Sequence, residues 1–188
     1  MCLKTVKETD LPCIQMNNMM EYNLIFIRLE KNLGVFRSMF EDVVKEEYLW
    51  RQSPEKWCML EILCHLHDEE KEDFRARVEF ILNDSKELPP SIDPVGWVTQ
   101  RDYISRNYID MLDMFLEERK ASISMLWSME KADWNKFFEH PQLGKVTAHM
   151  MLCNWLAHDY LHFRQIIRLK YDYLKSISVE DLQYAGIW

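Results

Sequence analysis

The chain has 188 residues, of which 48% are hydrophobic, 13% aromatic and 29% charged, as is typical of one globular domain that spans residues 1–188 and buries a core. Its formal net charge is -8 at pH 7, and no basic stripe of the kind that binds nucleic acid is present, so we expect no nucleic-acid partner. Four glycines and six prolines provide little turn chemistry for a sheet of many strands, and the composition therefore favours helices.

The cysteines and the first residues indicate the expected compartment. Five cysteines, an odd number without a C-x-x-C pair, predict neither a disulfide framework nor a thiolate zinc site. The first ten residues contain no apolar segment of the signal-peptide kind, and no apolar run is long enough to cross a membrane. We therefore expect a cytoplasmic protein with reduced thiols and no membrane association.

Two helices are predicted in the first half of the chain. After a loosely held lead-in of about 16 residues, apolar side chains recur at alternating spacings of four and three residues, as in a bundle helix. Ser53 and Pro54 predict the start of a second helix, with serine as its cap and proline at its first position. That helix should end near Leu82. The seam of the first helix consists of Tyr22, Phe26, Leu29, Leu33, Phe36, Phe40 and Val43.

A connector of some twenty residues, 84–105, follows the second helix and contains Pro89, Pro90 and Pro94. Antiparallel neighbours need no connector of that length, but it allows the third helix to run parallel to the second. The third helix should extend to about Met129 and carries Arg119 on its apolar seam. We favour a snorkelling surface arginine there; the alternative is a cation that reaches the bundle cavity.

A second loop, residues 131–145, precedes the fourth helix, for which Thr147 is the predicted cap. His140 and His149 have no partner at a spacing suited to metal ligands, and we interpret both as structural or exposed. The chain ends with aromatic Tyr184 and Trp188, which predict that the tail docks on the body.

The fourth helix carries the strongest chemical signal. Within residues 151–169, His158 and His162 lie one helical turn apart on an otherwise apolar stripe, so both imidazoles should point inward. One inward histidine is more often a core side chain, but a pair at this spacing can hold a single ion, as in H-E-x-x-H helices. Here Asp159 replaces the glutamate that serves as the base of such proteases.

A third ligand is expected from the second helix, where His65 and His67 lie about 200° apart and the helical wheel does not choose between them. Three imidazoles that leave one coordination position open are typical of catalytic zinc, although nickel and iron also accept imidazole nitrogen. A di-iron bundle would need Glu-x-x-His, and the sequence contains none.

These residues resemble the DinB/YfiT-like family of metal-binding four-helix bundles. The resemblance covers nearly the whole chain, and the final segment Tyr184–Trp188 is similar to the tail of some members. It is carried by Trp57, Glu61–Glu70, Asp73–Arg75, Phe115–Arg119, Gly144–Thr147 and, most specifically, Trp155–Ile166.

The resemblance implies an all-α, up-down-down-up four-helix bundle, frequent dimers and a metal site at His65, His158 and His162. It is the resemblance that selects His65 over His67. Members with known activity are similar to transferases that use a low-molecular-weight thiol activated by the metal, and others are described only as metal-dependent hydrolases. The implied cofactor is a divalent metal, Zn²⁺ or Ni²⁺ with Fe²⁺ as an alternative, and the implied partners are a small-molecule substrate and a second copy of the chain.

The residues leave the mechanism open. A metal with a free position can lower the pKa of a bound thiol or of bound water. Asp68 and Glu69 are candidates for proton handling and Asp159 for orienting an imidazole, although acids in a run such as 68–73 more often form a solvated helix face. Asn154 and Gln165 flank the histidine pair on the wheel and can line the cavity.

Two other classes of function remain as alternatives. One is a non-catalytic, stress-responsive bundle that binds a metal or a small ligand. The other is a helical interaction module in which the histidines are core polar residues and no metal binds.

Overall fold

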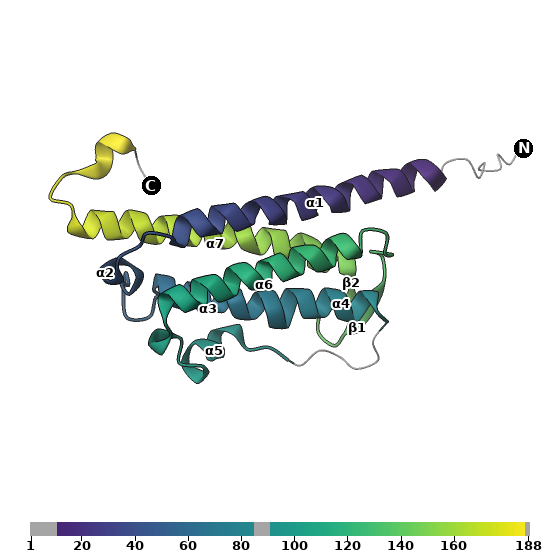
Figure 1. The fold of residues 1–188 in the computed structure, drawn as a ribbon, viewed down its shortest axis with the longest axis horizontal. Coiled ribbons are helices and arrows are strands. Elements are labelled where there is room, and N and C mark those ends of the chain that lie inside the picture. Colours follow the sequence, from purple (N-terminus) through teal and green to yellow (C-terminus); the bar gives the residue numbers. More distant parts are fainter. Residues whose placement is uncertain (1–10, 85–90, 187–188) are drawn as a thin grey trace, which may run out of the picture.

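Four long helical segments form a bundle. The structure, a computed structural model, describes residues 11–84 and 91–186, with side chains from residue 21 onward. In Figure 1, the first and last segments run in one direction and the two middle segments in the opposite one, which is the up-down-down-up order. The expected all-α four-helix bundle is therefore confirmed. The segments are α1 (Leu11–Phe40), the continuous run of α3 (Met59–Glu69), a π-helical turn (Glu70–Arg75) and α4 (Ala76–Leu82), then α6 (Tyr108–Ser128) and α7 (Ala148–Ile177).

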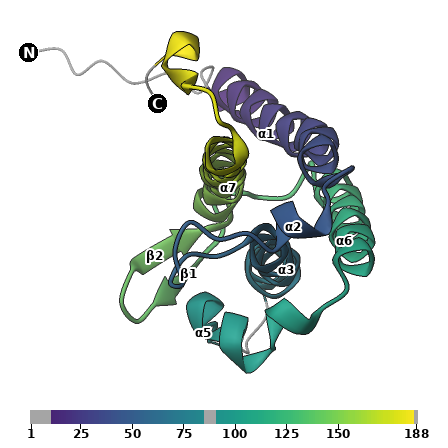
Figure 2. The same cartoon turned by 90° about the vertical axis from the view of Figure 1, so that its left-hand side faces the viewer.

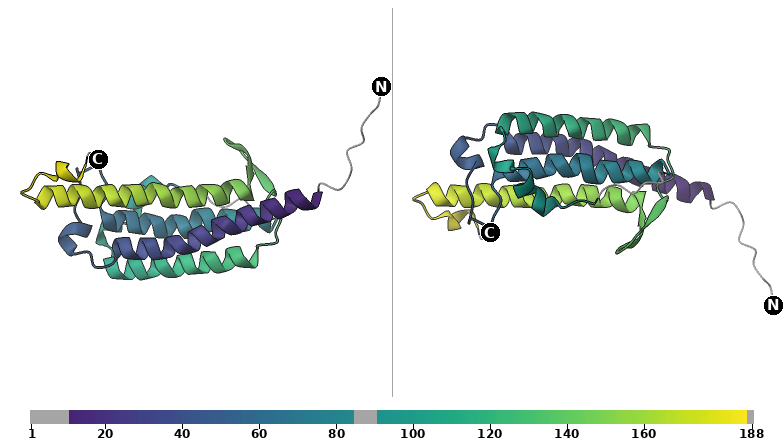
Figure 3. Two further views of the ribbon diagram at one scale, coloured as in Figure 1. Left: turned by 90° about the horizontal axis from the view of Figure 1, so that it is seen from above. Right: turned by 90° about the horizontal axis from the view of Figure 1, so that it is seen from below.

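The helix α3 is the central element of the bundle. Figure 2, which looks along the helices, shows α3 surrounded by α1, α6, α7 and the short α5 (Pro94–Gln100). In Figure 3, α6 and α7 lie on opposite sides of the bundle in both views. Every residue of α3 is buried, including its charged ones. Polar side chains on α3 must therefore find partners inside the protein.

The remaining elements are short. A four-residue helix α2 (Lys45–Tyr48) precedes α3, and the 3₁₀ turns Tyr103–Ser105 and Leu182–Ala185 precede α6 and close the tail. Beside α4, the strands β1 (Phe137–His140) and β2 (Gly144–Thr147) form an antiparallel hairpin in which Phe137 pairs with Thr147. The sequence analysis predicted no helix or strand in these segments.

Several predicted boundaries are confirmed. The second helical segment ends at Leu82 and the third at Ser128, within one residue of the predicted positions. Thr147 caps α7, because its Oγ1 accepts a hydrogen bond from the Met150 amide at 3.0 Å. Most of the first seam is buried, and it contributes to packing as expected.

The start of the second helix was predicted wrongly. The segment containing Ser53 and Pro54 is a turn, in which the Lys56 amide donates to the Ser53 carbonyl, and α3 begins only at Met59. Glu61 caps the start of α3. Its Oε2 accepts a hydrogen bond from the Cys58 amide at 2.9 Å, and its Oε1 accepts one from Arg51 at 2.7 Å. A carboxylate in the first turn, with both of its oxygens hydrogen-bonded, thus fixes the start of the helix.

The chain termini differ from expectation. The first helix begins at Leu11, inside the segment predicted to be a loose lead-in. The side chain of Tyr184 is fully exposed, so the predicted docking of the tail is wrong for this residue. Residues 1–10 and Trp188 lie outside the described residues. None of the described helices is long and apolar enough to span a membrane.

Two apolar clusters fill the bundle, one at each end. One contains Phe36, Phe40 and Phe115 together with much of α3, and the other contains Phe26, Trp134 and Val78. A layer of buried polar side chains lies at the boundary between the two clusters. The layer consists of Asn32 on α1, His65, Glu69 and Glu70 on the second segment, Arg119 and Ser122 on α6, and Asp159 and His162 on α7.

Arg119 is the cation of this layer. Its side chain is only 1% exposed, so the prediction of a snorkelling surface arginine was wrong. Its Nη1 and Nη2 donate to the two carboxylate oxygens of Asp159 at 2.8 and 2.7 Å, and its Nε lies 2.9 Å from Glu70 Oε1. The Asn32 amide and the Trp155 indole donate to the same two carboxylates, at 2.8 and 2.9 Å respectively. The network therefore joins all four helical segments.

We predict that Arg119→Met lowers the free energy of unfolding by about 3 to 5 kcal/mol, because it leaves two buried carboxylates without their cation. Urea denaturation measures this loss. The control is Lys120→Met at the next position, where the lysine is half exposed and pairs with Glu117, and a change below about 0.5 kcal/mol is expected. Equal effects of the two substitutions would contradict the buried network.

Candidate metal centre

The structure brings together the three histidines that the sequence analysis named as metal ligands. His65 comes from α3, while His158 and His162 lie one turn apart on α7. The Nε2 atoms of His158 and His162 are 2.9 Å apart, and the ring of His65 lies 4.9 Å from that of His162 and 5.6 Å from that of His158. One candidate ligand atom from each residue lies within 4.8 Å of the others. This is a spacing at which one ion can contact all three.

The other histidine of α3 faces elsewhere. His67 is buried, and its Nδ1 lies 2.8 Å from Asp68 Oδ1. The second oxygen of Asp68 accepts hydrogen bonds from Tyr103 at 2.6 Å and from Arg101 at 2.7 Å. Asp68 thus belongs to a separate polar cluster between α3 and the segment after α5, and it contacts none of the three clustered imidazoles.

Glu69 lies among the three histidines. It follows His65 by one helical turn, and its side chain is 9% exposed. Its Oε2 is 2.7 Å from His158 Nε2 and 3.6 Å from His65 Nε2. Of the three carboxylates that the sequence analysis associated with the histidines, Glu69 is the one that reaches them.

The other flanking residues have different contacts. Asp159 binds Arg119 and Asn32, and the role in orienting an imidazole that we considered for it does not fit these partners. Asn154 is exposed and donates to the Met150 carbonyl at 2.8 Å, so it does not line the site. Gln165 does lie beside His162, because both residues line the same cavity.

Two aromatic rings enclose the histidine cluster. Trp57 lies 4.8 Å from the ring of His65, and Phe74 lies 5.0 Å from the ring of His158. Phe74 belongs to the π-helical turn that begins directly after Glu69. Such turns inside α-helices occur frequently at functional sites. Sequence periodicity gave no indication of this turn, because the apolar spacing on either side of it also fits an uninterrupted helix.

Burial keeps two of the imidazoles neutral. Desolvation, together with the neighbouring His158, lowers the pKa of His65 to about 4 and that of His162 to about 2. Burial opposes ionisation of Glu69, but the hydrogen bond to His158 and the electrostatic effects of His65 and His158 together outweigh it and lower the pKa of this carboxyl. At neutral pH His65 and His162 therefore offer unprotonated nitrogens and Glu69 offers an ionised carboxylate, which is the donor chemistry that a divalent metal requires.

A cavity of about 500 Å³ opens beside the site and is lined by Leu161, His162, Arg164, Gln165 and Arg168 of α7. Its volume falls within the range of pockets for small molecules.

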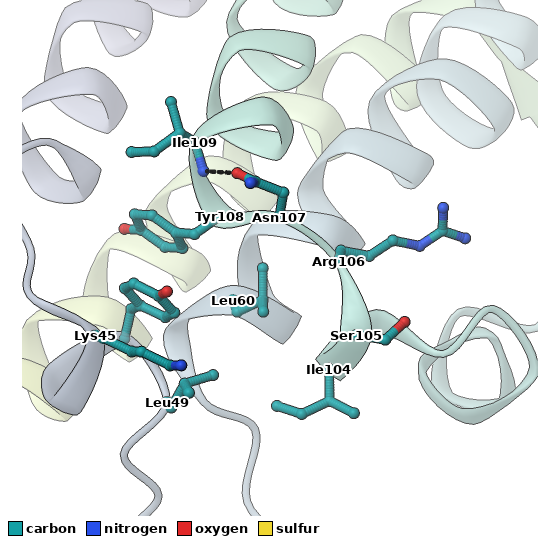
Figure 4. A pocket seen from close by; sticks show the side chains of 10 residues that line it. Lys45, Leu49, Leu60, Ile104, Ser105, Arg106, Asn107, Tyr108 and Ile109 are labelled. Carbon is teal, nitrogen blue, oxygen red and sulfur yellow. Dashed lines mark hydrogen bonds between the residues drawn. The ribbon is translucent and has the colours of Figure 1, made fainter.

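Another cavity, of about 430 Å³, lies at the end of the bundle where α2, α3 and α6 meet (Figure 4). It contains no histidine. The side chain of Asn107, which lines this cavity, caps α6 by accepting hydrogen bonds from the Ile109 and Asp110 amides. Of these two cavities, the one beside His162 adjoins the candidate metal centre.

The fold and the site define a helical bundle with a buried three-histidine cluster, and comparison with known proteins assigns it to a family. The sequence profile of the DinB superfamily matches residues 28–166, so the chain belongs to that superfamily. A search of curated proteins finds no match.

Among solved structures, the chain is similar to YfiT from Bacillus subtilis, with a TM-score of 0.70, 14% identity and 92% of each chain covered. That protein is described as a probable metal-dependent hydrolase with an unusual four-helix bundle topology. At this identity the likeness establishes the fold.

We predict that the metal-free protein loses stability as the pH falls from about 6.5 to 5. The folded state binds fewer protons than the unfolded state in this range, because the pKa values of His65 and His162 lie below the ordinary histidine value of about 6.5. Urea denaturation of chelator-treated protein at several pH values measures the slope. The slope should decrease in His162→Gln and persist in His140→Gln, a substitution in the β-hairpin; an unchanged slope in His162→Gln would contradict the assignment.

Proposed function

We propose that this member of the DinB superfamily is a metal-dependent enzyme in which His65, His158 and His162 hold a divalent ion. The observation that carries the proposal is the meeting of three imidazoles from two helices at distances that one ion can bridge. Burying several imidazoles together is costly unless each finds a partner, and an ion would serve all three. Zn²⁺ and Ni²⁺ are the first candidates, with Fe²⁺ as an alternative, because all three accept imidazole nitrogen.

An ion bound there would lower the pKa of a thiol or of water and so supply a nucleophile at neutral pH. The protein's own residues provide the surroundings for this step. The rings of Trp57 and Phe74 limit the access of bulk water to the histidines. The cavity beside His162 offers a small-molecule substrate a place next to the ion.

The three cysteines whose side chains the structure describes are poorly suited to supply a nucleophilic thiol. Cys58 and Cys64 are buried, and desolvation raises the pKa of Cys58 to about 11 and that of Cys64 to about 12. Burial also raises the pKa of the exposed Cys153. None of these three thiols is poised to form a thiolate, which supports the proposal that a transferase reaction would use a low-molecular-weight thiol. Hydrolysis by metal-bound water is the other reaction class, as in the description of YfiT.

A non-catalytic metal-binding bundle is the second candidate function. It is favoured by the position of Glu69, because three imidazoles and one carboxylate supply the four protein donors of a closed structural site.

A homodimer also belongs to the proposal. Tyr160, Ile167 and Leu174 recur every seven residues along α7 and are 41 to 50% exposed, which supports pairing with a second copy.

We predict about one equivalent of Zn²⁺, Ni²⁺ or Fe²⁺ per chain in the purified protein, measured by mass spectrometry of the elements. His158→Ala and His162→Ala should each lose most of this metal. His67→Ala is the matched control, because His67 is as buried as His162 but lies outside the cluster, and it should retain the metal. Full metal content in both cluster variants would contradict the ligand assignment and favour a helical interaction module.

We also predict turnover that depends on the metal, either of an electrophile in the presence of a small thiol or of an activated ester in water. Removal of the metal with a chelator should abolish turnover, and adding the metal back should restore it. Turnover that persists after metal removal would contradict activation of the nucleophile by the ion, and absence of turnover in all assays would favour the binding protein.

A further inference from the structure

We propose that Glu69 is a fourth ligand of the metal, so that the centre consists of three imidazoles and one carboxylate. This inference rests on the proposed function for the presence of an ion. The inference is based on the contact between this carboxylate and the histidines: Glu69 Oε2 lies 2.7 Å from His158 Nε2 and 3.6 Å from His65 Nε2.

The ring nitrogens that Glu69 contacts distinguish a ligand from an outer partner. An imidazole that binds a metal through Nε2 presents its Nδ1 to outer hydrogen-bond partners, and carboxylates that orient ligands bind there. Glu69 instead contacts Nε2 of His65 and His158, and Nε2 of His158 is also the atom that faces His162. The Nδ1 atom of His65 is buried and has no hydrogen-bond partner among the described residues. The carboxylate therefore lies on the side of the rings where the ion would sit.

The charges around Glu69 support the same role. Three acidic neighbours on the same helical segment each pair with an arginine: Asp68 with Arg101, Glu70 with Arg119 and Asp73 with Arg77. Glu69 is buried like them, yet among the described residues its close polar contacts are imidazoles. A buried carboxylate without a cationic partner is costly, and a divalent ion would supply the missing charge. In return, Glu69 would reduce the net charge of the ion and its ligands from +2 to +1.

This ligand set restricts the choice of metal. Four protein donors close a tetrahedral zinc site and leave no position for a nucleophile. The proposed activity then requires an ion that accepts a fifth or sixth ligand. Ni²⁺ and Fe²⁺ accept mixed nitrogen and oxygen ligands in geometries with more than four positions, so the inference favours them over tetrahedral Zn²⁺.

Cobalt substitution tests the role of Glu69. The metal-free full-length protein is titrated with Co²⁺, whose visible bands respond to the number and kind of its ligands, and the dissociation constant is measured with a competing chelator. The variants are Glu69→Gln, which keeps the shape and removes the charge, and Glu69→Ala, which also removes any donor oxygen. The matched control is Glu72→Gln on the same segment, because Glu72 is 42% exposed and binds Arg101. Circular dichroism checks that each variant is folded.

We expect the visible bands of bound Co²⁺ to shift in both Glu69 variants, and Co²⁺ affinity to fall by more than about 100-fold, beyond the 10- to 100-fold typical of lost outer partners. Glu72→Gln should match the wild type in both measurements. Co²⁺ spectra of the Glu69 variants that superimpose on the wild-type spectrum would overturn the inference, whatever the affinity.

The test separates this inference from the proposed function. If the wild type binds no Co²⁺, or if His158→Ala binds it as the wild type does, the metal centre itself is refuted. If His158→Ala loses Co²⁺ while the Glu69 variants keep the wild-type spectrum, only the fourth ligand is refuted.

Discussion

The buried ion pairs of Arg119 set the geometry on which the candidate metal centre depends. Arg119 on α6 binds Asp159 of α7 and Glu70 of the π-helical turn. Asp159 directly follows His158, and Glu70 directly follows Glu69. The guanidinium of Arg119 thus holds α7 and the second helical segment next to the residues of the candidate site. It also fixes the position of each helix along its axis, whereas apolar packing alone permits the helices to slide past each other. The 2.7 Å contact between Glu69 and His158 is a consequence of that alignment.

The apolar clusters explain why such a polar layer can exist. They lie on either side of it and seal its ends, and the layer carries charges that would be costly without partners. Arg119 contributes one positive charge against the two carboxylates that it binds. His65 and His162 remain neutral through burial, so these two side chains add no charge that the network would need to balance. The layer can therefore align the bundle through Arg119 and still present free nitrogen lone pairs a few ångströms away.

The sequence predicted those parts of the fold that depend on local chemistry and regular spacing. The seam of α1, the cap at Thr147 and the pairing of His158 with His162 on one face follow from helical geometry, and the structure agrees with each. Where two local signals competed, the prediction was wrong, because Ser53 resembles a helix cap but Glu61 provides the actual one.

Features that depend on partners distant in the sequence were missed. Arg119 was assigned to the surface because its partners lie on other helices, and the wheel could not choose between His65 and His67 because the whole of α3 is buried. The sequence analysis predicted no role for Asn32, although its position three residues after Leu29 and four before Phe36 indicates that a polar side chain enters the core.

The acidic run at residues 68–73 is mostly buried, although its composition favours a face exposed to solvent. Such runs usually form a solvated face, and Glu72 alone among its acids is largely exposed. The others lie on the central segment of the bundle, where α5 and the neighbouring helices cover them, so each needs a partner of its own. Arg77, Arg101 and Arg119 supply three of those partners, and among the described residues the close polar contacts of Glu69 are the imidazoles of His65 and His158. Among the described residues, every other buried carboxylate of the run pairs with an arginine, whereas Glu69 contacts only imidazoles, and this difference is the reason for proposing that a metal ion supplies its positive partner.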